Sequence, residues 1–317
     1  MFSTKVNIPI SSCKIRHEDN TLVRGSCFSE NMGRKLVENF FSVVVNPFGV
    51  LYNPVSIYNS LNFLLDGKRF SEKDLFYDGS LWYSFSHSTL FSDPDMNRCL
   101  ENINSALDKA EAFLSQPRFL IITFGTAWVF QNRETESVVS NCHKLPATQF
   151  VRYRLSVEEI KLSYIELIEK ISARYPEMKI IFTVSPIRHW KDGAHENNVS
   201  KSVLLLAIDE LQKRFDQVSY FPAYEILMDE LRDYRYYADD MLHPSALAAS
   251  YIWERFSQVY FSDSTLKLNK ELGRLVSDMS HRPIHPDSAA YRAFLENIEV
   301  RKKMLKDNYP FLCEKLK

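Results

Sequence analysis

Thr21-Leu-Val-Arg-Gly-Ser-Cys-Phe-Ser29 is the stretch that decides the fold of this 317-residue chain. Its first half is a short apolar run, Gly25 permits a tight turn, and a helical pattern with apolar residues at 3–4 spacing follows over residues 30–40. A strand that passes through a glycine turn into a helix indicates the start of an alternating β/α fold.

The same alternation continues along the chain. Strands are predicted where short apolar runs end at turn residues, near 21–25, 42–46, 118–125, 179–185 and 218–221. The runs are continuous rather than alternating, which indicates burial on both faces of a parallel sheet. We therefore predict a three-layer α/β/α sandwich around a flavodoxin-like parallel sheet of about five strands.

Segments outside this pattern suggest the domain organisation. The α/β domain is expected to span residues 1–261, with a polar and aromatic insertion near 66–96. Residues 131–155 are predicted to form a long loop, and a helix is expected to start with Pro244 at its first position. Residues 262–317 are predicted to form a helical C-terminal extension, with helices over 266–279 and 288–306, which can pack on the domain or support a homo-oligomer.

Composition excludes several classes of function. The 39 basic and 40 acidic residues give a net charge of −1, so nucleic acid and membrane surfaces are not expected partners. No apolar run approaches the roughly 20 residues that span a bilayer, and the N-terminus lacks the apolar region of a signal peptide. Five widely spaced cysteines fit a reducing compartment, so we predict a cytoplasmic location.

Neither a bound metal nor a cofactor is expected. Most of the eight histidines are far apart in the sequence, and no CxxC pair occurs. Phosphate-binding glycine motifs such as G-x-G-x-x-G are also absent from the sequence, which argues against a nucleotide-binding protein.

Chemistry is expected beyond the carboxyl ends of the strands, where open parallel sheets bind ligands. Cys27 would stand near a helix N-terminus, where the helix dipole favours a thiolate and free N–H groups can hold an oxyanion. After the last strand, Asp240 and His243 are spaced so that a carboxylate can orient a histidine base. The alternatives are a core cysteine behind a capping Ser26, and a helix cap at Asp240 or Ser245.

This combination resembles the SGNH/GDSL hydrolase superfamily, and the Gly25-Ser26-Cys27-Phe28-Ser29 turn resembles more narrowly the GSCFA family within it. Further stretches are similar to that family and fall in the right order: Asn46–Pro54, Gly125–Trp128, Asn141–Lys144, Ser185–His189 and Asp240–Ser245. The resemblance covers most of residues 20–250. It implies the α/β/α fold and a site more firmly than it implies a substrate.

The resemblance also implies roles for the motif residues. In the superfamily's Gly-Asp-Ser block, Cys27 stands at the position of the nucleophilic serine, and Ser26 is the alternative if the turn is shifted by one residue. Asp240 and His243 match the Asp-x-x-His block. Gly49 matches the glycine whose N–H enters the oxyanion hole.

One block departs from the superfamily pattern. Gly-x-Asn-Asp is matched only at Gly125, since Ala127 and Trp128 occupy the Asn and Asp positions. The missing side-chain donor could be replaced by one of three residues, namely Thr126, Asn46 or Asn141.

Other polar residues follow the same strand ends. Arg188 could bind a carboxylate, a phosphate or a sugar hydroxyl, although a surface arginine beside a structural His189 is an equal alternative. His143 lies with Asn141 in a segment expected over the sheet end, where functional residues concentrate.

The resulting expectation is an SGNH-type hydrolase that cleaves acyl esters through a Cys/Ser-His-Asp triad. Its substrate would be an acylated carbohydrate or another small polar ester. Two alternatives remain open: an O-acyltransferase that uses the same site, and a binding module that has lost catalysis, which the missing Gly-x-Asn-Asp block favours.

Overall fold

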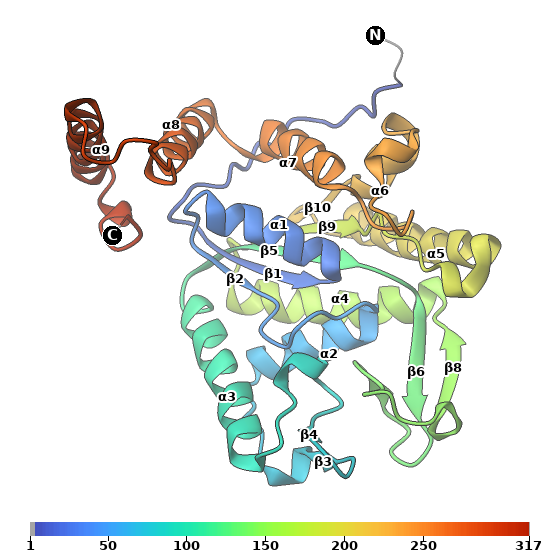
Figure 1. Ribbon diagram of the computed structural model, residues 1–317. Helices are drawn as coiled ribbons and strands as arrows, with labels where there is room; N and C mark the ends of the chain where they lie inside the picture. Colours follow the sequence, from blue (N-terminus) through green and yellow to red (C-terminus); the bar gives the residue numbers. More distant parts are fainter. Residues whose placement is uncertain (1–3, 317) are drawn as a thin grey trace.

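The central feature of the computed structural model, which describes residues 4–316, is a parallel sheet of five strands (Figure 1). The strands are β1 (Asn20–Gly25), β2 (Val43–Val45), β5 (Pro117–Phe124), β9 (Lys179–Val184) and β10 (Val218–Phe221). Their order, β10-β9-β5-β1-β2, is the doubly wound flavodoxin-like order. The predicted fold class is therefore confirmed.

Helices cover both faces of the sheet (Figure 1). One face carries α1 (Cys27–Glu38), α6 (Ala223–Glu225) and α7 (Ala246–Tyr260), and the other carries α2 (Pro54–Leu65), α3 (Met96–Phe113), α4 (Val157–Arg174) and α5 (Gly193–Arg214). Successive residues of β5 alternate between two apolar clusters, with Leu120 and Ile122 in one and Phe119 and Ile121 in the other. This two-sided burial explains why the strands are continuous apolar runs.

The segment predicted as a long loop forms a second, antiparallel sheet instead. Its strands are β6 (Trp128–Asn132), β7 (Val138–Val139) and β8 (Phe150–Arg154). Only one face of this sheet is buried, so polar residues such as Arg152 interrupt the apolar pattern and hide the strands in the sequence. Within the insertion, β3 (Phe76–Tyr77) pairs with β4 (Trp82–Tyr83).

The start of α7 also differs from the prediction. Pro244 lies before the helix in an isolated bridge with Tyr237, and α7 begins at Ala246. Ser245 is its N-cap, because its hydroxyl accepts a hydrogen bond from the backbone N–H of Ala248 at 3.3 Å.

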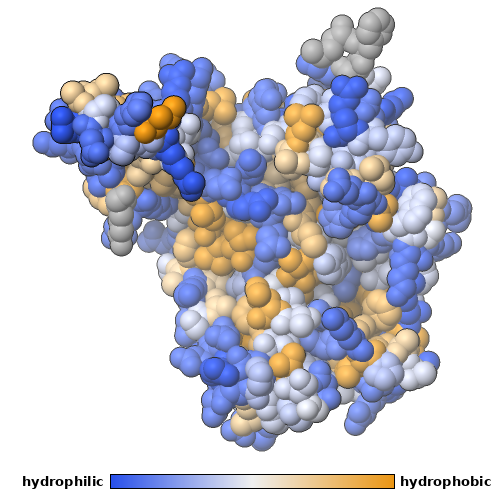
Figure 2. All heavy atoms as spheres, in the orientation of Figure 1, coloured by the Kyte–Doolittle hydropathy of each residue, from blue (hydrophilic) through white to orange (hydrophobic). Residues whose placement is uncertain are grey.

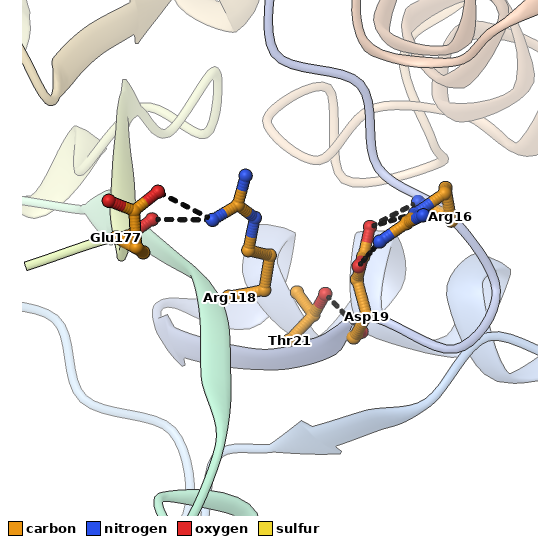
Figure 3. Close-up of polar contacts among 5 residues, drawn as sticks. All are labelled: Arg16, Asp19, Thr21, Arg118 and Glu177. Carbon is orange, nitrogen blue, oxygen red and sulfur yellow. Dashed lines mark hydrogen bonds and ion pairs between the residues drawn. The ribbon is translucent and has the colours of Figure 1, made fainter. Parts of the chain in front are cut away.

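Polar contacts hold the N-terminal ends of the strands, at the edge of the sheet opposite its carboxyl ends (Figure 3). Arg16 donates to the Asp19 carboxylate just before β1, and Thr21 donates its hydroxyl proton to the Asp19 carbonyl at 3.2 Å. Arg118 of β5 pairs with Glu177, which precedes β9, at 3.2 Å.

The chain ends in two helices that extend beyond the sheet, α8 (Asp263–Met279) and α9 (Ala289–Asn308) (Figure 1). His17 connects them to the domain, since its ring stacks on Phe41 at 4.2 Å and on Phe311 at 5.2 Å. The His17 ring also hydrogen-bonds Asn269 of α8 at 2.8 Å. Among the described residues, no helix has the length and apolar character required to cross a membrane.

Candidate active site

A cavity of about 750 Å³ opens beyond the carboxyl ends of β1, β5 and β9. It brings together residues that are far apart in the sequence. The predicted site residues among its walls are Ser26, Cys27, Thr126, Asn141, Arg188, His189 and His243.

Cys27 is the first residue of α1, and the turn that places it depends on Gly25. The Gly25 φ is +136°, and a Cβ there would lie 2.2 Å from the Thr123 carbonyl oxygen of β5, so only glycine fits. Ser26 is buried and caps α1 by accepting a hydrogen bond from the Phe28 N–H at 3.3 Å. The Ser26 hydroxyl is thus engaged in the turn, whereas the Cys27 thiol is partly exposed.

Tyr52 contacts the Cys27 thiol, with 3.3 Å between the hydroxyl oxygen and Sγ. Its backbone carbonyl accepts the N–H groups of Gly125 and Thr126 at 2.7 and 3.0 Å. A Cβ at Gly125 would lie 2.9 Å from that carbonyl oxygen, which accounts for the glycine. Burial, and next the Cys27 contact, raise the pKa of the Tyr52 hydroxyl well above its ordinary value, so it keeps its proton.

Sequence reasoning missed Tyr52, although it lies in the family-like stretch between Asn46 and Pro54. A tyrosine that follows two apolar residues, Val50 and Leu51, gives no signal of function by itself. Tyr52 reaches Cys27 because the loop after β2 turns back toward α1. The path of that loop could not be predicted from the sequence.

Asp240 and His243 form a pair in the loop before α7. The His243 Nδ1 lies 2.5 Å from Asp240 Oδ2, and Asp240 Oδ1 accepts the backbone N–H groups of Leu242 and His243 at 2.9 Å each. The two backbone hydrogen bonds, with the ring contact, lower the pKa of Asp240 to about 2. The carboxylate therefore stays ionised and fixes the orientation of the imidazole.

The predicted contact between base and nucleophile is not made in this conformation. Within residues 4–316, His243 forms no hydrogen bond to Ser26 or Cys27, although the ring lines the same cavity as both. Its Nε2 has no partner in that described part of the chain.

A second imidazole, that of His189, lies beside Tyr52. The two rings meet edge to face with 5.9 Å between their centroids. Burial is the main cause that lowers the pKa of His189 to about 4, so this ring is neutral at pH 7. The neighbouring Arg188 donates to Asn198 Oδ1 at 3.0 Å, and its guanidinium lies 5.2 Å from the Trp190 ring.

Lys201 of α5 fixes the floor of the site and was also missed. Its Nζ is buried and donates to the carbonyl oxygens of Gly125 at 2.6 Å and Ser185 at 2.7 Å, just after β5 and β9. Burial lowers the pKa of Lys201 to about 7. One side chain thus ties together two strand ends beneath the cavity.

The antiparallel sheet supplies one wall of the cavity. Trp128 lines the cavity, and the Arg152 guanidinium lies 4.4 Å from the centre of its ring. Arg152 also pairs with Asp192. This wall adds an aromatic and basic surface that the predicted loop did not suggest.

Gly49 and Asn46, both predicted as oxyanion donors, form hydrogen bonds within and between loops instead. The Gly49 N–H is donated to the Asn46 carbonyl at 2.7 Å, so it is not free for an oxyanion in this structure. Asn46 Oδ1 accepts the Gly25 N–H at 2.9 Å, which ties the end of β2 to the Cys27 turn. Both residues line a second cavity rather than the one that contains His243.

Of the two site residues predicted in the segment over the sheet end, Asn141 lines the cavity and His143 does not. The buried His143 contacts the Ser84 carbonyl through Nε2 at 3.0 Å and lies against Tyr83, so it holds the insertion instead of lining the cavity. Asn141 does line the cavity, but its Oδ1 accepts the His143 N–H at 2.7 Å and its Nδ2 donates to Thr89. Thr126 Oγ1 likewise contacts Ser200 at 3.1 Å.

Fold and site together define a class of protein: a doubly wound α/β protein with a cysteine at the first helix N-terminus and an Asp–His pair after the last strand. The model of the GSCFA family matches residues 20–256, and that of the GSCFA domain protein, C-terminal domain, matches residues 272–315. The chain belongs to the GSCFA family. No curated protein matches it.

Two solved structures show a distant likeness. One is a Streptococcus pneumonia protein with the provisional description of a platelet activating factor, 16% identical over 75% of this chain and 84% of its own, with a TM-score of 0.37. The other is a Corynascus thermopiles (Myceliophthora fergusii) carbohydrate esterase family 2 enzyme with a carbohydrate binding domain. It is 15% identical over 50% of this chain and 38% of its own, with a TM-score of 0.27.

Proposed function

We propose that this chain is an SGNH-type hydrolase that cleaves acyl esters with Cys27 as its nucleophile. The observation that carries the proposal is that the Cys27 thiol, the protonated Tyr52 hydroxyl and the Asp240-oriented His243 ring converge on one cavity. A nucleophile, an oxyanion donor and an oriented base are the parts that acyl transfer needs.

The reaction follows from these parts. His243 Nε2 takes the Cys27 thiol proton as Sγ attacks the ester carbonyl carbon, and the tetrahedral intermediate expels the alcohol, which takes that proton from His243. Water then attacks the Cys27 thioester and gives a proton to His243. The second intermediate collapses to the carboxylic acid and a thiolate, which His243 reprotonates. His243 must approach Cys27 for these steps, through movement of the exposed loop that carries it.

Tyr52 and the Cys27 backbone would stabilise the oxyanion. Cys27 is at the first position of α1, where a backbone N–H has no partner within the helix. The Tyr52 O–H lies beside the sulfur and keeps its proton. These two donors would replace the Gly49 N–H and the missing Asn side chain of the superfamily pattern.

The walls favour a small polar substrate such as an acylated carbohydrate. Trp128 and Trp190 offer flat aromatic faces, and Arg188 offers a charged donor for hydroxyl or carboxylate oxygens. An O-acyltransferase would use the same steps with a sugar hydroxyl in place of water. A non-catalytic binding module is the other candidate, because His243 makes no hydrogen bond to Cys27 or Ser26 in the described chain.

Ester hydrolysis by single variants tests the proposal. With p-nitrophenyl acetate and an acetylated sugar as substrates, we expect Cys27→Ala and His243→Ala each to lower kcat/KM by about 10³-fold or more. The matched control is Ser26→Ala, which we expect to keep its activity within about tenfold while losing about 1 kcal/mol of stability with the helix cap.

Mass spectrometry of the acyl-enzyme gives a second readout. A thioester on Cys27 after brief exposure to ester supports the nucleophile assignment, with the exposed Cys313 as the reference thiol. Full activity in His243→Ala would refute the triad. Failure of the wild type to hydrolyse any ester or to form the Cys27 adduct would instead support the binding module.

A further inference from the structure

A second cavity, of about 680 Å³, also has Cys27 in its wall. It lies between α1, the end of β2 and the insertion, and we call it the α1 groove. Cys27 therefore stands where two cavities meet, one with His243 and one without it. An ester whose carbonyl carbon lies at Cys27 could extend into both cavities, with one part on each side of the carbonyl.

The α1 groove follows one face of α1. The lining positions on this helix, 27, 30, 31, 34 and 37, follow an i, i+3, i+4, i+7, i+10 pattern, which places them on a single face. From Cys27 to Val37 this face extends about 15 Å. Gly33 lets α1 lie close to β2, because a Cβ there would be only 2.5 Å from a Val45 methyl group.

The two cavities differ in chemistry. Aliphatic side chains from three segments line the α1 groove: Val37, Val45, Val50 and Leu90. Leu90 is 82% exposed and Val37 is 55% exposed, so both present apolar surface to water. Figure 2 shows apolar side chains gathered on the face that α1 and β2 occupy in Figure 1.

The two cavities also differ in charge. The α1 groove has one acidic and one basic side chain, Glu30 and Arg34, and thus no net charge. The cavity that contains His243 has three basic side chains, Arg152, Arg188 and Lys191, against the single carboxylate of Asp192. An uncharged aliphatic group therefore fits the α1 groove. The cavity that contains His243 combines its basic side chains with apolar ones such as Phe130 and Phe150, so it fits a group with both a polar or anionic part and a flat apolar part.

We propose that the α1 groove binds the aliphatic acyl chain of the ester, while the alcohol part occupies the cavity that contains His243. This inference rests on the proposed function, because it places the reacting carbonyl at Cys27. The length of the groove suits a medium-length acyl chain better than an acetyl group. Each methylene buried there is expected to strengthen binding about fourfold.

Chain-length preference tests the proposal. For the wild type we expect kcat/KM for p-nitrophenyl octanoate to exceed that for the acetate by tenfold or more. Leu90→Asp and Val37→Asp should lower this octanoate-to-acetate ratio at least fivefold, because each places a charge beside the chain. Leu162→Asp, a matched change on the exposed face of α4, should leave the ratio unchanged.

A binding measurement keeps the test independent of catalysis. In a Cys27→Ala background, calorimetry should show that N-octanoylglucosamine binds at least tenfold more tightly than N-acetylglucosamine, and Leu90→Asp should remove the difference. Equal binding of the two ligands, or an unchanged octanoate preference in Leu90→Asp, would overturn the proposal. If the wild type cleaves no ester but the octanoyl preference in binding depends on Leu90, the proposed function fails and the groove assignment stands.

Discussion

A single hydroxyl group distinguishes Tyr52 from phenylalanine, and its oxygen lies 3.3 Å from the Cys27 sulfur. We expect Tyr52→Phe to lower kcat for ester hydrolysis by about 10²-fold or more, because an oxyanion donor acts mainly in the transition state. The fold should be unaffected, since the Tyr52 backbone carbonyl still receives the Gly125 and Thr126 N–H groups. Steady-state kinetics with a thermal melt checks both points, and an unchanged kcat would remove Tyr52 from the site.

The residues that could be predicted from the sequence are those whose roles are local. Gly25 and Cys27 belong to one turn, and the Asp240–His243 pair spans one loop, so spacing alone indicates their geometry. The family resemblance predicts an oxyanion role for Gly49, but the Gly49 N–H is donated within a turn to the Asn46 carbonyl. This turn depends on the positive φ of Asn46, and that backbone conformation could not be predicted from the sequence.

At the scale of elements, Lys201 joins the ends of β5 and β9 to α5. Lys201→Met would remove the donors of two buried carbonyl groups, and each unsatisfied carbonyl costs about 1–3 kcal/mol. We therefore expect a clear loss of stability in urea denaturation, larger than that of an exposed change such as Lys213→Met.

The same side chain should make stability depend on pH. The pKa of Lys201 is about 7 in the folded chain, against an ordinary value of 10.5, so the unfolded chain binds more protons between these values. The free energy of unfolding should therefore rise with pH across this window, by at most about 1.4 kcal/mol per pH unit. Lys201→Met should lack this contribution, and equal slopes for both proteins between pH 7 and 9 would contradict the expectation.

Strands that are buried on both faces could be predicted from the sequence, whereas strands buried on one face could not. The inner strands β1, β5 and β9 are buried on both faces, so each is visible as a mainly apolar run. Strand β8 is buried on one face only and contains Arg152 and Arg154, which resemble loop residues in the sequence. The cavity wall that this strand helps to build could not be predicted for the same reason.

At the scale of the whole molecule, the C-terminal helices depend on a small contact with the domain. The Phe311 ring packs with the apolar cluster of α8 and α9 and stacks on His17. We expect Phe311→Ala to speed amide hydrogen exchange in α8 and α9 while leaving β5 protected, because the two regions have separate apolar clusters. Leu295→Ala, on the exposed side of α9, is the control and should change little. Equal loss of protection in β5 would mean that the tail and the sheet unfold together.

The two tail helices could be predicted from their amphipathic pattern, but their docking could not. It involves His17, which lies about 250 residues before its partner Asn269, and Phe40, whose carbonyl accepts a hydrogen bond from Lys315. Neither His17 nor Phe40 has a sequence feature that predicts such a partner. Self-association through these helices and a cytoplasmic location stay predictions.

Strand β2 lies at the edge of the sheet and is only three residues long. A longer edge would expose a row of unpaired backbone groups, on which a foreign strand could build and from which aggregates grow. Here the row ends at Asn46, whose φ of +44° turns the chain away. The molecule can thus keep an apolar groove open beside this edge without offering a template for strand addition.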